Sequence, residues 1–275
     1  ALKLFNARIK LYMLSFIKRI IKKAVVKLIA ISGSTKWGKR INEKIIVDVM
    51  SREKKVIHNG YEMSFSVPNQ LNHSRIDTFS TKEPETLEWI DGFSPGTVLW
   101  DIGGNLGLYS LYTALKDNSA KVFTFEPSIF NLEVMTRNVV LNSVQEQITV
   151  MPVALSETSK IDTLHMTTTA WGGAMSTFGQ NYGYDGKKMD EVFSYKMPSC
   201  SLDDLIEYFD IEQPNAIKID VDGIEHLILK GGEAILKSQQ LKTILIEVND
   251  DFAEQKNGVR ELLEKAGLKL KIKKH

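Results

Sequence analysis

A short apolar run, 98–100, is followed by one acid, Asp101, and by three glycines, the last of which is Gly107. Gly103 and Gly107 permit positive φ angles and let a ligand approach the backbone closely. Asp101, at the end of the apolar run, adds a negative charge. The helix that we expect after Gly107 presents free N–H groups to a carboxylate or phosphate. A ligand that needs both features is a cationic amino acid joined to a nucleoside.

A second acid stands where such a ligand would carry its ribose. Glu126 ends the apolar run that starts at Val122, and it lies 25 residues after Asp101. A carboxylate at the tip of the neighbouring strand can accept two hydrogen bonds from ribose hydroxyls. A dinucleotide is disfavoured, because the G-x-G-x-x-G pattern would need glycine where Asn105 and Leu108 stand.

More polar side chains follow two later apolar runs. The acids are Asp220, Asp222 and Glu225 after the first run and Glu247 and Asp250 after the second, with Asn249 between the last two. One acid could act as a general base, several could hold a divalent cation, and some could cap helices. We favour a site role for Asp220 because its strand end abuts the predicted ligand. No His/Cys pair has zinc spacing, and we name no metal ligand while a divalent cation on the carboxylates stays open.

Strands and helices alternate along most of the chain. The pattern predicts an α/β fold with a doubly wound, largely parallel sheet, preceded by a basic amphipathic helix and a β-hairpin. Asn59-Gly60 is a strong hairpin-turn signal between 54 and 67. In such sheets ligands bind beyond the carboxyl ends of the strands, so all the acids named above should face one crevice.

We expect three regions: a helical arm and linker over 1–40, the hairpin extension over 41–82 and a cofactor-binding domain over 83–275. Residues 167–198 form the least regular stretch, rich in glycine and aromatic residues, and we interpret it as a lid on the acceptor side. A last strand should start at Gly267. No partner strand follows the run 268–272, so we expect C-terminal residues to be missing.

The arm is strongly basic, with eleven Lys and Arg and no Asp or Glu in residues 1–40. Its apolar face could lie on an anionic membrane surface, or it could dock on its own domain or on a second subunit. The apolar face argues against a nucleic-acid arm.

Composition is ordinary for a globular protein, with 43% hydrophobic residues and a net charge of +1. The single cysteine, Cys200, excludes an internal disulfide and fits a reducing compartment. No run of 18 apolar residues predicts a transmembrane helix. We therefore expect a cytoplasmic protein, peripheral on the membrane if the arm binds lipid.

The motifs VLWDIGGNLGLYSL, FEPS, PVALSE, SLDDL, IKIDVDGIEHLILKGG and ILIEV together resemble the FkbM family of S-adenosylmethionine (SAM) methyltransferases, from about Glu83 onward. The family usually has Ala at Gly104 and Glu at Asp222. The resemblance implies O-methylation of a hydroxyl on a sugar, glycan, glycolipid or natural product. It implies SAM contacts from Asp101, Gly103, Asn105, Gly107 and Glu126, and it places Asp220, Asp222 and Glu225 around the transferred methyl.

Two alternatives stay open at this point. One is a nucleic-acid or protein methyltransferase with the same cofactor site, which the acidic stretch from Asp220 disfavours. The other is a non-catalytic adaptor at a membrane surface that keeps the fold, which the intact cofactor motif disfavours.

Overall fold

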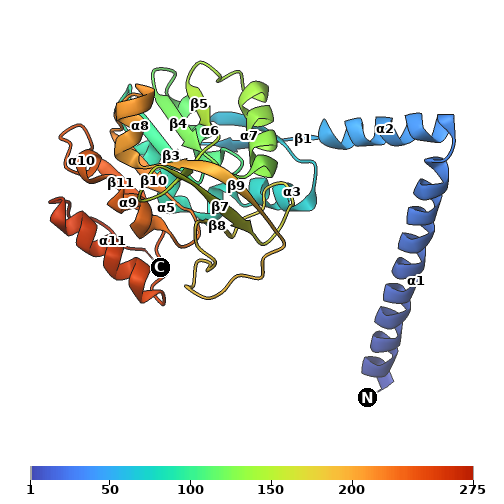
Figure 1. Ribbon diagram of the computed structural model, residues 1–275. Coiled ribbons are helices and arrows are strands. Elements are labelled where there is room, and N and C mark those ends of the chain that lie inside the picture. Colours follow the sequence, from blue (N-terminus) through green and yellow to red (C-terminus); the bar gives the residue numbers. More distant parts are fainter. Residues whose placement is uncertain (1, 275) are drawn as a thin grey trace. The chain divides into compact units, whose positions relative to one another are not determined.

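The computed structural model describes the backbone of residues 2–274 and the side chains of residues 13 and 15–274. The chain forms two compact units, residues 1–52 and residues 53–275. The first unit consists of two helices, α1 (Leu2–Ser32) and α2 (Lys36–Met50) (Figure 1). The helix predicted for 2–31 is confirmed. The second helix was not predicted, because the Ser-Gly-Ser stop after α1 reads as the start of a linker.

A five-stranded parallel sheet forms the centre of the second unit (Figure 1). Its strands are β3 (Val98–Ile102), β4 (Lys121–Phe125), β5 (Ile148–Met151), β10 (Ala216–Ile219) and β11 (Thr243–Ile246). The order β11-β10-β3-β4-β5 confirms the predicted doubly wound α/β fold. The chain reverses its direction of travel across the sheet between β3 and β10. Ligands of doubly wound sheets bind at such a reversal.

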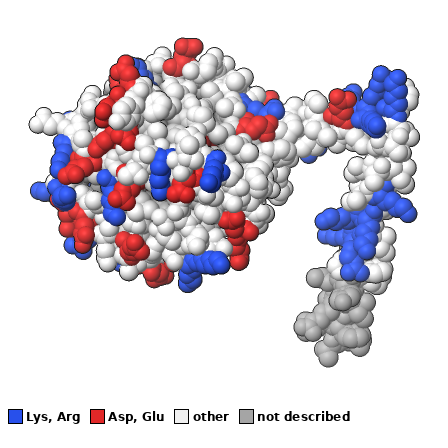
Figure 2. Space-filling view, viewed as in Figure 1, with Lys and Arg blue, Asp and Glu red and all other residues white. Residues whose placement is uncertain are grey.

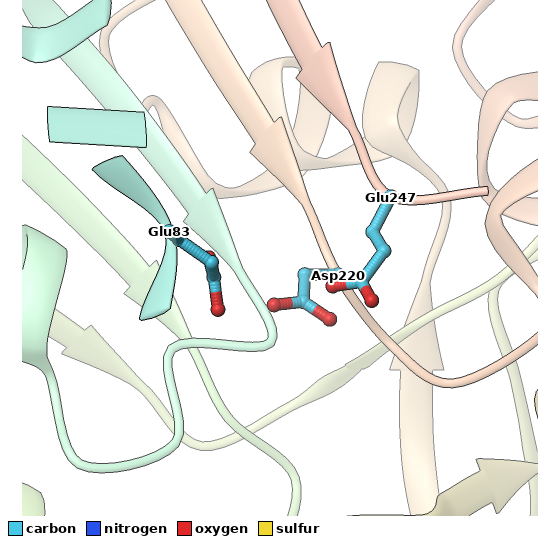
Figure 3. A group of neighbouring side chains, drawn as sticks. All are labelled: Glu83, Asp220 and Glu247. Carbon is cyan, nitrogen blue, oxygen red and sulfur yellow. The ribbon is translucent and has the colours of Figure 1, made fainter. Parts of the chain in front are cut away.

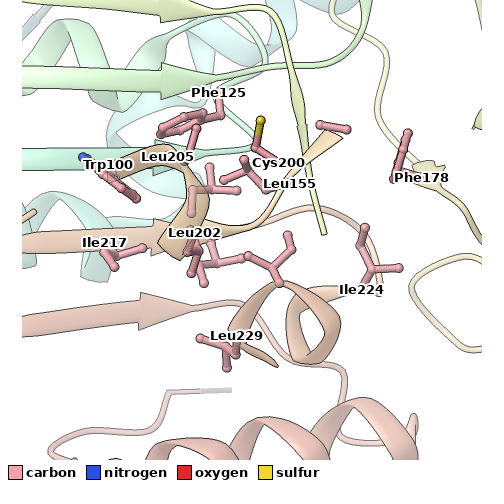
Figure 4. Close-up of a cluster of buried hydrophobic side chains, with 14 of the residues drawn as sticks. Trp100, Phe125, Leu155, Phe178, Cys200, Leu202, Leu205, Ile217, Ile224 and Leu229 are labelled. Carbon is pink, nitrogen blue, oxygen red and sulfur yellow. The ribbon is translucent and has the colours of Figure 1, made fainter. Parts of the chain in front are cut away.

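Alternating residues of β3 send their side chains into two separate cores, as expected for a strand buried on both faces. Leu99 packs with the hairpin and with the helices α3 (Gln70–Asp77), α4 (Phe79–Lys82), α5 (Pro84–Asp91), α6 (Leu108–Lys116) and α7 (Ile129–Leu141). Trp100 and Ile102 pack on the other face (Figure 4) against α8 (Leu202–Phe209), α9 (Glu225–Lys230), α10 (Glu233–Leu236) and α11 (Ala253–Lys265).

The predicted hairpin is present as β1 (Glu53–His58) and β2 (Tyr61–Ser66), which pair antiparallel. Asn59 and Gly60 both have positive φ angles, 47° and 87°. Two positive φ angles define the type I′ turn that the Asn-Gly pair favours. Met63 and Phe65 of β2 then carry the hairpin into the core beside Leu99.

A second sheet interrupts the crossover from β5 to β10. It contains β6 (Ala154–Leu155), β7 (Lys160–Met166), β8 (Ser176–Phe178) and β9 (Phe193–Cys200), in the order β6-β9-β7-β8. The stretch 167–198, predicted as the least regular part of the chain, contains β8, and β9 begins within it. Their pairing partner is β7, so the hydrogen bonds that form these strands are not local in sequence.

The run 268–272 is not a strand, which corrects the prediction for Gly267 onward. A strand needs a neighbour to pair its backbone groups, and these residues pair with none of the described strands. Leu270 and Ile272 are instead exposed. Among the described residues, no helix is both long and apolar enough to cross a membrane.

Candidate active site

The turn from β3 to α6 is folded tightly against the ends of both neighbouring strands. Gly103 has a φ of 85° and donates its N–H to the Phe125 carbonyl at 2.9 Å. A Cβ atom on Gly103 would lie 1.9 Å from the carbonyl oxygen of Asp220. Gly107, also in the left-handed region, starts α6. Glycine is thus required at Gly103 both for its φ angle and for the close approach of β10.

Glu126 holds this turn from the β4 side. Its side chain is buried, and its two carboxylate oxygens accept hydrogen bonds from the N–H groups of Asn105 at 2.8 Å and Ser128 at 2.7 Å. Burial raises the pKa of Glu126 to about 7, against the opposing effect of these N–H donors. The acid predicted at the tip of the second strand therefore contacts the glycine-rich turn itself.

Asp101 contacts the helix that follows the same turn. It is 1% exposed, and its Oδ2 accepts a hydrogen bond from Ser110 Oγ in α6 at 2.6 Å. Its other oxygen, Oδ1, is buried without a partner. Burial raises the pKa of Asp101, and Lys218, its neighbour in register on β10, opposes that effect. Asp101 and Glu126 thus converge on one turn and helix start.

Three carboxylates meet at the ends of β10 and β11. Glu83, Asp220 and Glu247 each place an oxygen within 4.8 Å of the others (Figure 3). The buried ammonium of Lys218 contacts Asp220 Oδ2 at 2.8 Å. The ammonium of Lys82 contacts Glu83 Oε1 at 2.9 Å. We name these three acids and two lysines the acid cluster. Because the cluster carries its own cations, we propose no metal ion there.

The charges of the acid cluster give its members different proton affinities. Burial alone would raise the pKa of Asp220, but the Lys218 ammonium lowers it below the usual value. The Asp220 carboxylate, together with burial, raises the pKa of Glu247 to about 7. Asp220 is therefore ionised at neutral pH, while Glu247 titrates there. A pair of this kind can accept a proton from a hydroxyl group.

Glu83 and Lys218 were missed by the sequence analysis. Glu83 precedes a helix that begins with proline, and nothing local marks it as a site residue. Lys218 does carry a signal, because a lysine inside a buried parallel strand needs a partner to offset the loss of its hydration. Burial would lower the pKa of Lys218, but the Asp220 and Asp101 carboxylates raise it.

The other two predicted catalytic acids hold the backbone after β10. Asp222 has a φ of 63°, and its Oδ2 accepts a hydrogen bond from the Met175 N–H. Glu225 is 1% exposed and accepts bonds from the N–H groups of Val221 and Gly223 and from the Gln255 amide. Asp222 is thus linked to the backbone at Met175, and Glu225 is enclosed within the turn.

We name residues 171–175, which include Met175, the strap. Asn69 donates to the Trp171 carbonyl at 2.9 Å and Arg75 donates to the Gly172 carbonyl at 2.9 Å. The Gly173 carbonyl accepts from the side chains of Asn105 at 2.8 Å and Asn131 at 3.0 Å. The strap therefore joins α3 to the glycine-rich turn. Of the residues that hold it, Asn105 was identified from the sequence, whereas Asn69, Arg75 and Asn131 were not.

An apolar pocket lies against the glycine-rich turn, with Gly103 in its lining. Ile102, Phe125 and Val221 form its floor at the strand ends, and Leu155 and Phe178 of the second sheet form its wall. Its lining suits the flat face of an aromatic base. The pocket, the turn and the acid cluster thus all lie at the carboxyl ends of the parallel strands.

Comparison with known proteins agrees with this geometry. Residues 101–270 match the methyltransferase FkbM domain. A relative from Haloferax volcanii, hexuronic acid methyltransferase AglP, is 27% identical over 78% of this chain and 82% of its own length. A second, 31-O-demethyl-FK506 methyltransferase FkbM from Streptomyces tacrolimicus, is 24% identical over 57% of this chain and 66% of its own length.

Among solved structures, an FkbM methyltransferase from Methylobacillus flagellatus superimposes with a TM-score of 0.45 at 16% identity. That match covers 63% of this chain and 38% of the other. The sheet and the matched domain define a class I, Rossmann-like methyltransferase, an enzyme whose class implies SAM as methyl donor. The chain belongs to the FkbM methyltransferase family.

One departure from the usual family pattern has a structural reason. At Gly104, where the family usually has Ala, a Cβ atom would lie 2.1 Å from the hydroxyl oxygen of Thr124. The Thr124 side chain therefore occupies the space that an alanine methyl group would need.

Proposed function

We propose that this protein transfers the methyl group of SAM to a hydroxyl group of a sugar or natural product. The observation that carries the proposal is the Asp220–Glu247 pair, which stands beside the glycine-rich turn and has the charge to accept a hydroxyl proton. The names of the two relatives support the substrate class, since one acts on a hexuronic acid and the other on an O-demethylated natural product.

The cofactor residues in this proposal are Asp101, Gly103, Asn105, Gly107 and Glu126. The fit rests on two buried oxygens without partners, Asp101 Oδ1 and Asn105 Oδ1, which can accept bonds from an amino group. Glu126 keeps free lone pairs for ribose hydroxyls, and the start of α6 offers N–H groups to a carboxylate. When bound, SAM supplies a methyl group already activated on a sulfonium.

The chain itself then aligns the acceptor and removes its proton. Asp220 accepts the hydroxyl proton as the new oxygen–carbon bond forms, and Lys218 fixes the Asp220 carboxylate in place. Asp222 holds the strap, and Glu225 holds the turn that carries Asp222, so both act as positioning residues. The strap and the rest of 167–198 form the lid that excludes water, which protects an alignment on which the rate depends.

Two measurements test the proposal. SAM at 100 times its Kd should stabilise the protein by about 2.7 kcal/mol in a thermal shift experiment. Labelled methyl groups should then pass from SAM into hydroxyl-bearing sugars or glycans when these are offered as fractionated acceptors. Label found only in nucleic acid or protein would contradict the proposal, and an absent thermal shift would favour the non-catalytic adaptor.

We expect Glu126→Ala to weaken SAM binding by about 10- to 100-fold. The variant loses hydrogen bonds between a carboxylate and the ribose hydroxyls, and bonds to charged groups contribute roughly 1.5–3 kcal/mol each. Isothermal titration calorimetry with SAM measures the change.

A ribose-modified ligand separates this effect from general loosening of the turn. A 2′-deoxy analogue should bind wild type more weakly than SAM does, yet lose little further affinity in the variant. Equal losses for both ligands would mean that Glu126 acts only through the Asn105 and Ser128 N–H groups.

We expect kcat to fall to a lower plateau as the pH drops below about 7 and to level off above it. Protonated Glu247 donates a hydrogen bond to Asp220 and lowers its basicity, and the Glu247 proton leaves near pH 7. Glu247→Gln should be slower above pH 7 and should lose this pH dependence. Glu261→Gln, an exposed acid on α11, is the matched control. If kcat of Glu247→Gln still decreased below pH 7 as in wild type, the titrating group would be a residue other than Glu247.

A further inference from the structure

The two helices of residues 1–52 expose large apolar side chains along most of their length. In α1, Phe16 and Ile20 are 52% and 51% exposed, and in α2 Trp37 is 75% exposed. The remaining exposed apolar residues are Met13, Ile17, Ile21, Val25, Val26, Leu28, Ile29 and Ile31 in α1 and Ile41, Ile45, Ile46 and Val47 in α2. Soluble proteins rarely leave so many neighbouring apolar groups in water without a partner.

The charged side chains of this unit are mostly positive. The exposed residues Lys18, Arg19, Lys22, Lys23 and Lys27 of α1 bear positive charge, and α1 has no acid. Lys36, Lys39, Arg40 and Lys44 continue the basic character in α2, against two acids. Figure 2 shows blue groups dominating these helices, whereas red and blue are mixed over the second unit. Cations beside an apolar stripe complement an anionic lipid surface.

Hydrogen bonds and a close backbone contact fix the connection between α1 and α2. The Thr35 hydroxyl accepts the Gly38 N–H at 2.9 Å and begins α2. A Cβ atom on Gly38 would lie 1.8 Å from the Ser32 carbonyl oxygen, so only glycine lets the helices approach this closely. The Ser32 hydroxyl donates to Asn42 Oδ1 at 3.0 Å. This corner gives α1 and α2 a defined junction.

We infer that α1 and α2 together form an anchor that lies on the surface of an anionic lipid bilayer. Neither helix, within its described residues, is both long and apolar enough to cross a membrane. The exposed cations beside the apolar stripe favour a position in the interface. Trp37 suits the headgroup level, and the lysine stems can extend from the apolar stripe toward phosphates. A second copy of the chain is a poorer occupant, because two such helices would bring many like charges together.

Co-sedimentation of the full chain with phosphatidylcholine vesicles, with and without phosphatidylserine, tests the anchor. Binding should require phosphatidylserine and should weaken with added salt. Lys18→Gln/Lys22→Gln should lower binding about thirty-fold, at about 1 kcal/mol per cation near the surface. The matched control, Lys196→Gln/Lys269→Gln, removes two exposed lysines of the second unit and should bind as wild type does.

Apolar contact is tested in the same assay. Ile17→Gln/Ile20→Gln should lose most of its binding, while Ile161→Gln, which changes an exposed isoleucine of the second unit, should not. Bilayer contact should shift Trp37 fluorescence to the blue, and Trp37→Phe should abolish that shift.

Three results would overturn the anchor: equal binding to neutral vesicles, no binding to either vesicle, or a dimer in sedimentation velocity that Ile17→Gln/Ile20→Gln dissociates. Far-UV circular dichroism, which measures the helix content of both units, shows that each variant is folded.

Discussion

Asp220→Asn is expected to bind SAM with unchanged affinity and to lower kcat by about 10²–10⁴-fold, the usual contribution of a general base. The amide keeps the size of the carboxylate but cannot accept the hydroxyl proton. It also leaves the Lys218 ammonium without its closest counter-ion. Single-turnover methyl transfer measures the chemical step, and calorimetry with SAM measures the retained affinity.

The matched control is Asp210→Asn. Asp210 is an exposed acid at the end of α8, at the opposite edge of the sheet, and asparagine tolerates its left-handed φ of 50°. The control should turn over at the wild-type rate. If Asp220→Asn also keeps that rate, Asp220 is not the base, and the proton must leave through Glu247 or water.

Gly103→Ala is expected to destabilise the protein by roughly 2–5 kcal/mol and to abolish SAM binding. A left-handed φ costs a residue with a Cβ atom roughly 1–2 kcal/mol. Overpacking against the Asp220 backbone adds about 1–3 kcal/mol. Urea denaturation gives the first quantity and calorimetry the second. Because the clash falls on Asp220, relief of the strain would displace the proposed base.

Gly60→Ala isolates the conformational part of this cost. Gly60 has nearly the same φ, 87° against 85°, but a Cβ atom there would meet nothing within 4 Å. It should cost about 1–2 kcal/mol and leave SAM binding intact. Equal destabilisation by the two substitutions would show that the backbone at Asp220 moves away from a Cβ atom on Gly103 at little cost. The close contact between Gly103 and Asp220 would then have no role in placing Asp220.

The central sheet could be predicted because its signals are local. Apolar runs end in acids or glycines, and each run is followed by a helical pattern, so strand order and crevice follow from general rules of α/β folds. Asn59-Gly60 predicted the hairpin for the same reason, since the turn requires two positive φ angles. The positions of Asp101 and Glu126 followed from the strand ends.

What the sequence could not show depends on contacts between distant segments. Glu83 and Asp220 are separated in sequence by more than half of the second unit, yet their carboxylate oxygens lie close together. The strap is held by Asn69, Arg75 and Asn131, whose side chains look like ordinary surface polar groups in sequence. Nothing local distinguishes them, because their partners are backbone carbonyl or N–H groups of a loop about 40 to 100 positions away.

The second sheet is inserted in the crossover from β5 to β10, and its role differs from that of the parallel sheet. The parallel strands carry the residues assigned to the cofactor and the proton, whereas the inserted β7 and β8 supply Leu164 and Phe178 to the pocket wall. Because the pocket suits an aromatic base, substitutions in the inserted sheet should change how tightly the nucleoside part of the methyl donor is held, while the residues assigned to the proton stay in place. A lineage could therefore tune its affinity for the donor by remodelling that module alone.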